Sequence, residues 1–399
     1  MARRVVTIAL LALLAAASST LAQVEKPLET IADVPTRGRL ALVKASEARK
    51  AGDDGRAVEV LQDIVDNHPN QDHYLVRFHL ANSLAGAERL AEAADQYEAA
   101  VALEPRHAES WLSLGQVSFE TGSYTRAAAA LEEAFKGSDM PQTVWLYYAG
   151  VAYLQGDQPE QGVRVLRDLC RGRLGTPALD WFRALIAAES QVDDRRAGDR
   201  AVADMLTIYP DEPAAWFLKY QHALHYEDYR AAVVGLTVKD YLEPLALTER
   251  VRLGDILSAA EAPSWAAVHY RAALGDEPSS GDYERLVRAH LAAHENDEAL
   301  AVLDNALLLA PSFTLWSMKG YAAYERENFA TALDAFAECL ILDPGYVRAY
   351  TLMGYCALEL NRFDEAQISL NRAMESAEER RTATGLMREL KLRREALVE

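Results

Sequence analysis

The sequence predicts an all-α protein, a solenoid of about ten helix-turn-helix units that ends in a capping helix. Prolines recur at intervals close to 34 residues, or about twice that, and a period of this length with two helices per unit is typical of a solenoid. Within a period, apolar residues step by three or four positions in two runs, as in residues 111–135, where the break falls at 121–123. The prolines are Pro69, Pro105, Pro141, Pro210, Pro244, Pro278, Pro311 and Pro344.

The first 22 residues have the features of a secretory signal peptide. Two arginines precede an apolar run over residues 5–17, and a Thr-Leu-Ala sequence supplies small residues before the cleavage point. The run is shorter than the roughly 20 residues that a bilayer-spanning helix needs. We therefore expect cleavage after Ala22, a periplasmic or secreted protein without an integral membrane span, and a flexible lead-in over residues 23–37.

Charge and cysteine content narrow the possible partners. The formal net charge of −19 repels phosphate backbones and anionic headgroups, so neither nucleic acid nor a generic membrane surface is expected as a partner. Three cysteines cannot form a complete disulfide framework. Cys339 and Cys356 fall on consecutive expected helices. They are either two buried small residues or a disulfide-bonded pair.

The residue types fit close packing of neighbouring helices. Glycine inside a helix costs about 0.5–1 kcal/mol relative to alanine, so its presence there indicates a close approach that offsets the cost. We expect large side chains to fill the space between units and proline to end each second helix. The glycines are Gly115, Gly254, Gly320 and Gly354, and the large side chains are Trp111, Trp216, Trp316 and Tyr350.

These residues resemble the tetratricopeptide repeat (TPR) family, whose first helix carries W-x2-L-G-x2-Y and whose second carries A-x3-F-x2-A before a proline. The resemblance implies a right-handed superhelical solenoid of about ten TPR units with a C-terminal capping helix. The best matches are Trp316, Gly320, Phe329, Ala332, Phe336 and Pro344; Tyr350, Gly354, Phe363, Ala366 and Leu370; Leu253, Gly254, Ala266, Tyr270 and Pro278; and Trp111, Leu114, Gly115, Tyr124 and Ala127.

The resemblance covers nearly all of the expected mature chain, residues 38–380, and residues 381–399 read as the capping helix. Gln142 to Pro210 departs most from the pattern, because Gly162 and Gly198 stand where the family has alanine. The expected repeats lie near 38–71, 74–107, 108–141, 143–176, 179–212, 213–246, 247–280, 280–313, 313–346 and 347–380.

No catalytic constellation is visible in the sequence, and we expect no enzyme activity, cofactor or metal. The pairs His222 with His225 and His290 with His294 have helical spacing but lack a clustered third ligand. The alternative is a regulatory or enzymatic subunit with its site in the irregular repeats 142–210. That site would include Trp181, Asp193, Asp194 and Arg195.

Binding is the expected activity, because stacked helical hairpins expose their first helices along one surface. Toward the C-terminus this surface is predicted to be basic and aromatic. Arginine grips a carboxylate with two hydrogen bonds and tyrosine offers rigid contact area, which suits an extended peptide with acidic side chains or a C-terminal carboxylate. The candidate groove residues are Arg252, Arg285, Arg288, Tyr321, Tyr324 and Tyr355.

Together these features predict a non-catalytic protein-interaction scaffold of the cell envelope that holds a protein or peptide in its groove. The resemblance includes exported bacterial repeat proteins that organise envelope assemblies.

Overall fold

The computed structural model describes residues 29–396, and all of its regular structure in that range is helical. The chain divides into two compact units, with the boundary between Tyr209 and Pro210. The first unit contains α2 (Glu29–Ala32), α3 (Thr36–Lys50), α4 (Asp54–Asn67), the 3₁₀ helix η1 (Pro69–Gln71), α5 (Tyr74–Gly86), α6 (Leu90–Leu103), α7 (Ala108–Glu120), α8 (Tyr124–Gly137), α9 (Thr143–Gln155), α10 (Pro159–Cys170), α11 (Leu179–Gln191) and α12 (Arg195–Ile208).

The second unit continues the same alternation of two helices and a short turn. It contains α13 (Pro213–His225), α14 (Tyr229–Leu242), α15 (Leu247–Ala259), α16 (Pro263–Ala272), α17 (Ser280–Ala292), α18 (Asn296–Leu309), α19 (Phe313–Glu325), α20 (Phe329–Leu342), α21 (Val347–Glu359), α22 (Phe363–Glu375) and α23 (Arg380–Ala396). The pairs from α3–α4 to α21–α22 form ten hairpins, numbered 1 to 10 below.

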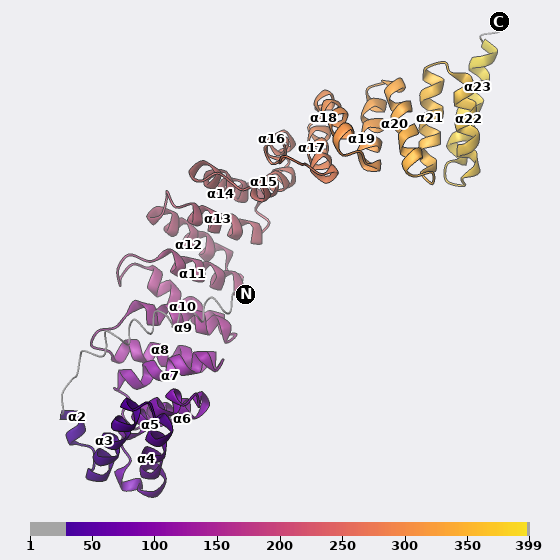
Figure 1. Ribbon diagram of the computed structural model, residues 1–399. Helices are drawn as coiled ribbons and strands as arrows, with labels where there is room; N and C mark the ends of the chain where they lie inside the picture. The colour runs from indigo at the N-terminus through magenta and orange to yellow at the C-terminus, as the bar shows by residue number, and fades with distance from the viewer. Residues whose placement is uncertain (1–28, 397–399) are drawn as a thin grey trace. The chain divides into compact units, whose positions relative to one another are not determined.

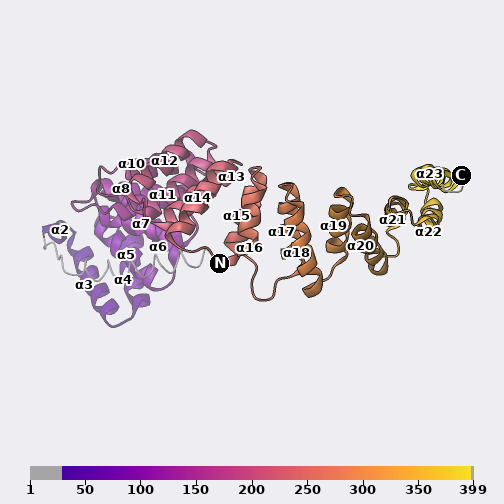
Figure 2. The same ribbon diagram turned by 90° about the horizontal axis from the view of Figure 1, so that it is seen from above.

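The prediction of an all-helical solenoid is confirmed. The substantial helix contacts join elements that are consecutive or next but one along the chain. In both views α19 to α22 lie side by side in chain order (Figure 1, Figure 2). A hairpin therefore buries its apolar face against its sequence neighbours, which is the stabilising principle of a solenoid.

Five first helices place a glycine against a large side chain of the second helix. A methyl group added at Gly320 would come within 2.6 Å of the Phe336 ring, and one at Gly254 would come equally close to the ring of Tyr270. No real side chain tolerates such a distance, so the glycine sets how closely the two helices approach. The pairs, each sixteen residues apart, are Gly115–Leu131, Gly150–Leu166, Gly254–Tyr270, Gly320–Phe336 and Gly354–Leu370.

The tryptophans, which were expected to fill the space between units, lie at the edge of the core. Trp111 and Trp316 pack against core clusters of neighbouring hairpins, and both, like Trp216, are only partly buried. The indole N–H groups of Trp111 and Trp216 donate to the carbonyls of Pro105 and Pro210, at 2.8 and 2.7 Å. An indole needs a partner for its N–H, and here that partner lies in the exposed turn before the helix. The close contacts inside a hairpin come instead from the side chain sixteen residues after the glycine.

All ten hairpin turns use the same backbone device. One residue per turn has a positive φ, from 55° to 79°. The N–H of the residue after it donates to the carbonyl of the residue five positions earlier, at 2.8–3.0 Å. This is the Schellman closure of a helix. Glycine occupies only two of the ten positions, which are Gly52, Glu88, Gly122, Asp157, Asp193, Glu227, Glu261, His294, Glu327 and Asn361.

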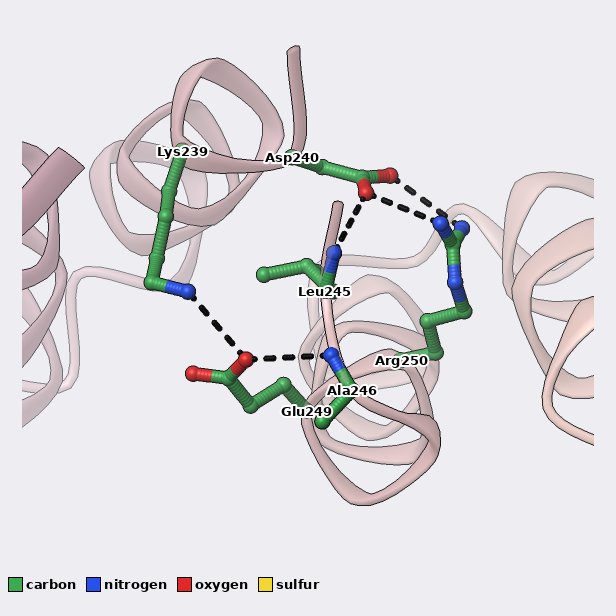
Figure 3. A network of polar contacts seen from close by, with 6 residues as sticks. All are labelled: Lys239, Asp240, Leu245, Ala246, Glu249 and Arg250. Carbon is green, nitrogen blue, oxygen red and sulfur yellow. Dashed lines mark hydrogen bonds and ion pairs between the residues drawn. The ribbon is translucent and has the colours of Figure 1, made fainter. Parts of the chain in front are cut away.

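Hairpins 6 and 7 are joined by two ion pairs, which we call the α14–α15 clasp (Figure 3). Lys239 Nζ lies 3.1 Å from Glu249 Oε2, and the guanidinium of Arg250 donates to both carboxylate oxygens of Asp240, at 3.0 and 3.2 Å. The same carboxylates accept the backbone N–H groups of Leu245 and Ala246. The clasp therefore fixes the irregular segment 243–246 between the two helices.

The two ends of the described chain are both packed. From residue 29 on, the expected flexible lead-in contains α2 and the first turn of α3, and Val34 is buried against the first hairpin. The expected signal peptide, residues 1–22, lies outside the described residues. At the other end α23 packs on α21 and α22, and Arg393 donates to Glu359 at 2.8 Å. This helix covers the last hairpin, as a capping helix does.

Cys170, Cys339 and Cys356 are free thiols in the described chain. Burial raises the pKa of Cys339 to about 11 and that of Cys356 to about 12, so both are protonated at neutral pH. Cys339 and Cys356 act as small core residues.

Within residues 29–396, no helix combines the length and the apolar character that crossing a bilayer requires.

A candidate partner-binding groove

A groove of about 530 Å³ opens between hairpins 7 and 8, inside the second unit. A volume of this size lies within the usual range of ligand sites. Its walls come from the end of α15, the start of α16 and the second half of α17. We call it the arginine groove; its lining residues are Ser258, Glu261, Pro263, Tyr270, Arg285, Arg288, Ala289 and Ala292.

Two of the predicted residues, Arg285 and Arg288, line this groove together. They lie one helical turn apart on α17, which puts both guanidinium groups on one wall. Arg285 donates to Asp282 at 2.6 Å, and Arg288 lies 3.8 Å from Glu284. Both ion pairs are intrahelical and partly exposed, and such pairs are weak. An incoming carboxylate can therefore exchange for the existing partners at small cost.

The floor of the groove is a fixed aromatic side chain. The Tyr270 ring packs on Gly254, and its hydroxyl donates to Asp255 Oδ1 at 2.7 Å. Burial raises the pKa of Tyr270 to about 12, so the hydroxyl stays protonated and keeps its role as donor. Small side chains, Ala289 and Ala292, complete the floor. The groove thus pairs a cationic wall with a small apolar base.

Tyr270 was not among the predicted groove residues, because it belongs to a second helix. Its position could have been found from the sequence: it follows Gly254 by sixteen residues, the interval at which five hairpins place their large side chain. Arg252, in contrast, is exposed on α15 and is not part of the groove lining.

The three predicted tyrosines form contacts of their own, farther along the second unit. Tyr321 packs edge-on against Phe336, with ring centroids 5.4 Å apart, and its hydroxyl lies 2.8 Å from that of Tyr346. This contact joins hairpin 9 to the start of α21. It fixes the orientation of Tyr321 and occupies its hydroxyl.

Tyr324 and Tyr355 meet across hairpins 9 and 10. Their ring centroids lie 5.4 Å apart, and the Phe329 ring lies 5.9 Å from that of Tyr355. Burial raises the pKa of both hydroxyls. The structure therefore separates the six predicted residues into an arginine pair in the groove, one exposed arginine, and tyrosines that stabilise neighbouring hairpins while remaining partly exposed.

The first unit has a smaller groove of about 310 Å³ between α3 and α5. Arg49 and Lys50 give it a basic edge, although Arg49 donates to Asp54 at 3.2 Å. Burial, with Arg49 and His107 nearby, lowers the pKa of His79 in its wall to about 4, so this imidazole is neutral at pH 7.

The residues of the enzymatic alternative have structural contacts. Asp193 is the positive-φ residue of its turn, and Asp194 caps α12 by accepting the Ala197 N–H at 3.0 Å. Arg195 lies 3.8 Å from Asp199 on the next turn of that helix. Within residues 29–396, no group of three or more His, Cys, Asp or Glu side chains is arranged to hold a metal ion.

Comparison with known proteins gives a consistent result. One family model described as tetratricopeptide repeat matches residues 42–101, 78–141 and 284–347. A second model with the same description matches residues 323–390, and together the two cover about half of the chain. No curated protein matches the sequence.

Several solved structures match parts or most of this chain. A structure of Naa15/Naa10 bound to HypK-THB is similar over 90% of this chain, with 16% identity and a TM-score of 0.50, and the match covers 66% of that chain, just under two thirds. YrrB, described as a TPR protein with an unusual peptide-binding site, matches 47% of this chain and 94% of its own, with 16% identity and a TM-score of 0.33. The MamA protein matches 41% of this chain and 90% of its own, at 19% identity and a TM-score of 0.36.

Proposed function

The chain belongs to the tetratricopeptide repeat family, and we propose that it is a non-catalytic scaffold of the cell envelope that holds a partner peptide in the arginine groove. Protein interaction is the general role of this repeat fold. The observation that carries the proposal is the pairing of Arg285 and Arg288 on one wall of a groove with a small apolar floor.

The favoured ligand is an extended peptide with a free C-terminal carboxylate or an acidic side chain. Two guanidinium groups on one wall provide the forked donors that a carboxylate accepts. Ala289, Ala292 and the side of Tyr270 leave room for a small side chain next to that carboxylate. We propose the partly exposed tyrosines on the first helices of hairpins 9 and 10 as further contacts for such a peptide.

Export is the second part of the proposal, and it is supported by the signal-like sequence of residues 1–22. A fusion of residues 1–30 to a reporter that is active only outside the cytoplasm tests it. Activity of the fusion, together with a mature N-terminus at Gln23, is expected. A reporter that stays inactive, with Met1 retained on the full chain, would overturn the envelope assignment.

The groove is tested with matched peptides and charge reversals. Peptides with a free C-terminus should bind the full chain at least tenfold more tightly than the same peptides with a C-terminal amide or with lysine in place of acidic residues. The double variant Arg285→Glu with Arg288→Glu should lose this preference for a free C-terminus and for acidic residues.

The control for those variants is Arg362→Glu with Arg372→Glu. Both control arginines pair with a glutamate three positions later, and their exposure is similar to that of Arg285 and Arg288. Circular dichroism should show unchanged helicity in both double variants. Equal loss of binding in the control would mean that net charge, and not the groove, determines capture. Separately, crosslinking followed by mass spectrometry of co-purifying proteins identifies the natural partner.

A further inference from the structure

Two neighbouring hairpins leave large aliphatic side chains strongly exposed at the same position. Leu308 and Leu309 end α18 and are 83% and 64% exposed, while Ile341 and Leu342 end α20 and are 71% and 52% exposed. The two pairs lie 33 residues apart, which is one repeat. They therefore occupy equivalent places on hairpins 8 and 9, and we call these four residues the outer ridge.

The fold does not need these side chains. In α18 the core contacts come from Leu303 and Leu307, and in α20 they come from Phe336 and Cys339, all of which are buried. The ridge residues follow after the core positions and point away from that face. Exposed aliphatic pairs that recur at the same position of consecutive hairpins, on an otherwise acidic protein, favour an interaction surface along these helix ends.

The ridge has clear ends, which limit the size of whatever covers it. In hairpin 10 the place of Ile341 is taken by Glu375, which is exposed, and in hairpin 7 the short helix α16 ends at Ala272, before this position. Two packing steps of 8–10 Å separate α18 from α20, so the ridge spans at most about 20 Å. A helix of about 13 residues has that length.

Acidic side chains border the ridge. Asp304 and Glu338 lie four and three residues before the exposed pairs on their helices, and Asp343 follows Leu342 directly. Lys319 binds Asp304, with Nζ 2.7 Å from the carboxylate, and Arg348 is exposed at the start of α21. The border is therefore acidic along both helices. Of the two basic side chains near it, Lys319 is already paired with Asp304, and Arg348 lies on the next helix.

We propose that the outer ridge docks an amphipathic helix of a partner protein, one whose apolar stripe is flanked by lysine and arginine. Apolar contacts along the ridge supply affinity, and opposite charges at the border supply orientation. A second copy of this chain would bring acidic border against acidic border, which disfavours self-association. An anionic lipid surface meets the same repulsion.

This surface is independent of the arginine groove. The ridge lies on second helices of hairpins 8 and 9, whereas the groove is formed mainly by α15 and α17, and the two have opposite charge preferences.

The test uses two synthetic helical peptides of 14 residues with the same leucine stripe, one flanked by Lys and Arg and the other by Glu, and the full-length chain. The basic peptide should bind in a fluorescence anisotropy titration, at least tenfold more tightly than the acidic one. The double variant Leu308→Glu with Ile341→Glu should bind the basic peptide at least tenfold more weakly, and added salt should lower the affinity further.

Matched variants make the result decisive. Ile368→Glu on α22 changes a similarly exposed aliphatic residue outside the ridge, and should leave binding unchanged. Arg285→Glu with Arg288→Glu should also leave it unchanged, which separates this surface from the groove. Equal affinity for both peptides, or equal binding by the ridge variant, would overturn the proposal. The proposal would also be overturned if the wild type sediments as a dimer and the ridge variant as a monomer, because the ridge would then bind a second copy of this chain.

Discussion

Gly320 of α19 lies directly against the ring of Phe336 on α20, so that even a methyl group at position 320 would come within 2.6 Å of the ring. The same arrangement recurs sixteen residues after the glycine in hairpins 3, 4, 7 and 10. The spacing of the two helices in these hairpins is therefore set by a missing side chain.

Gly320→Ala should lower the free energy of unfolding by about 1–3 kcal/mol, because overpacking outweighs the helix propensity that alanine adds. Gly385→Ala on α23 is the matched control, since nothing lies within 4 Å of its added methyl. That control should gain about 0.5–1 kcal/mol. Urea denaturation measures both, and a Gly320→Ala protein as stable as the control would contradict the contact.

Turn residues give a prediction of opposite sign. Glu327 has a φ of 60°, a conformation that costs a residue with a side chain about 1 kcal/mol or more. Glu327→Gly removes this cost but adds freedom to the unfolded chain, so a net gain of up to about 1 kcal/mol is expected.

Gly122→Ala is the reciprocal change, at a φ of 76° with open space around the added methyl. It should lose about 1 kcal/mol from backbone strain alone. Thermal melts followed by circular dichroism rank the two variants against the wild type. If Glu327→Gly melts lower than Gly122→Ala, the left-handed geometry does not govern these turns.

The α14–α15 clasp should contribute more than a surface ion pair. Asp240→Ala leaves Arg250 and the Leu245 N–H without their acceptor, which should cost about 1–3 kcal/mol. A double-mutant cycle with Arg250→Ala should give a coupling energy of about 1 kcal/mol that 0.5 M salt reduces only partly, since both side chains are mostly buried. Additive effects of the two changes would show that the pair does not join the hairpins.

Acid should weaken the first unit through His79. Its pKa is about 4 in the folded chain and about 6.5 when unfolded. Between these values the unfolded state binds the proton first, so stability is full above pH 6.5 and falls as the pH drops toward 4. The loss is about 3 kcal/mol, since each unit of difference between the two pKa values is worth about 1.4 kcal/mol.

The variant His79→Gln cannot bind that proton and should show a flatter dependence of unfolding free energy on pH across the same window. An NMR titration of His79 in the wild type measures the pKa directly. A midpoint near 6.5, or an unchanged slope in the variant, would show that burial does not hold the imidazole neutral.

Sequence patterns predicted the hairpins well, because both the helical spacing and the terminating prolines are local features. The glycines indicated close helix approach, but the pattern did not say which side chain fills the space. Inside a hairpin that space is filled by residues such as Leu131 and Phe336, whereas Trp111 packs at the edge of the core and donates its indole N–H to a carbonyl in the preceding turn.

Features that depend on tertiary placement were not predictable in the same way. Eight of the ten positive-φ residues in the hairpin turns have charged or polar side chains, so only Gly52 and Gly122 indicated their turns in the sequence. The helical spacing of Arg285 and Arg288 puts them on one face of α17, and both line the arginine groove. The ring contacts of Tyr324 and Tyr355 depend on how hairpin 10 meets hairpin 9, which a single helix pattern does not contain.

Helix contacts that reach no farther than the next element or the one after it have a mechanical consequence. We therefore expect a stretching force to detach hairpins one at a time from an end of a unit, and each hairpin to reattach when the tension falls. Each unit would then lengthen in small reversible steps.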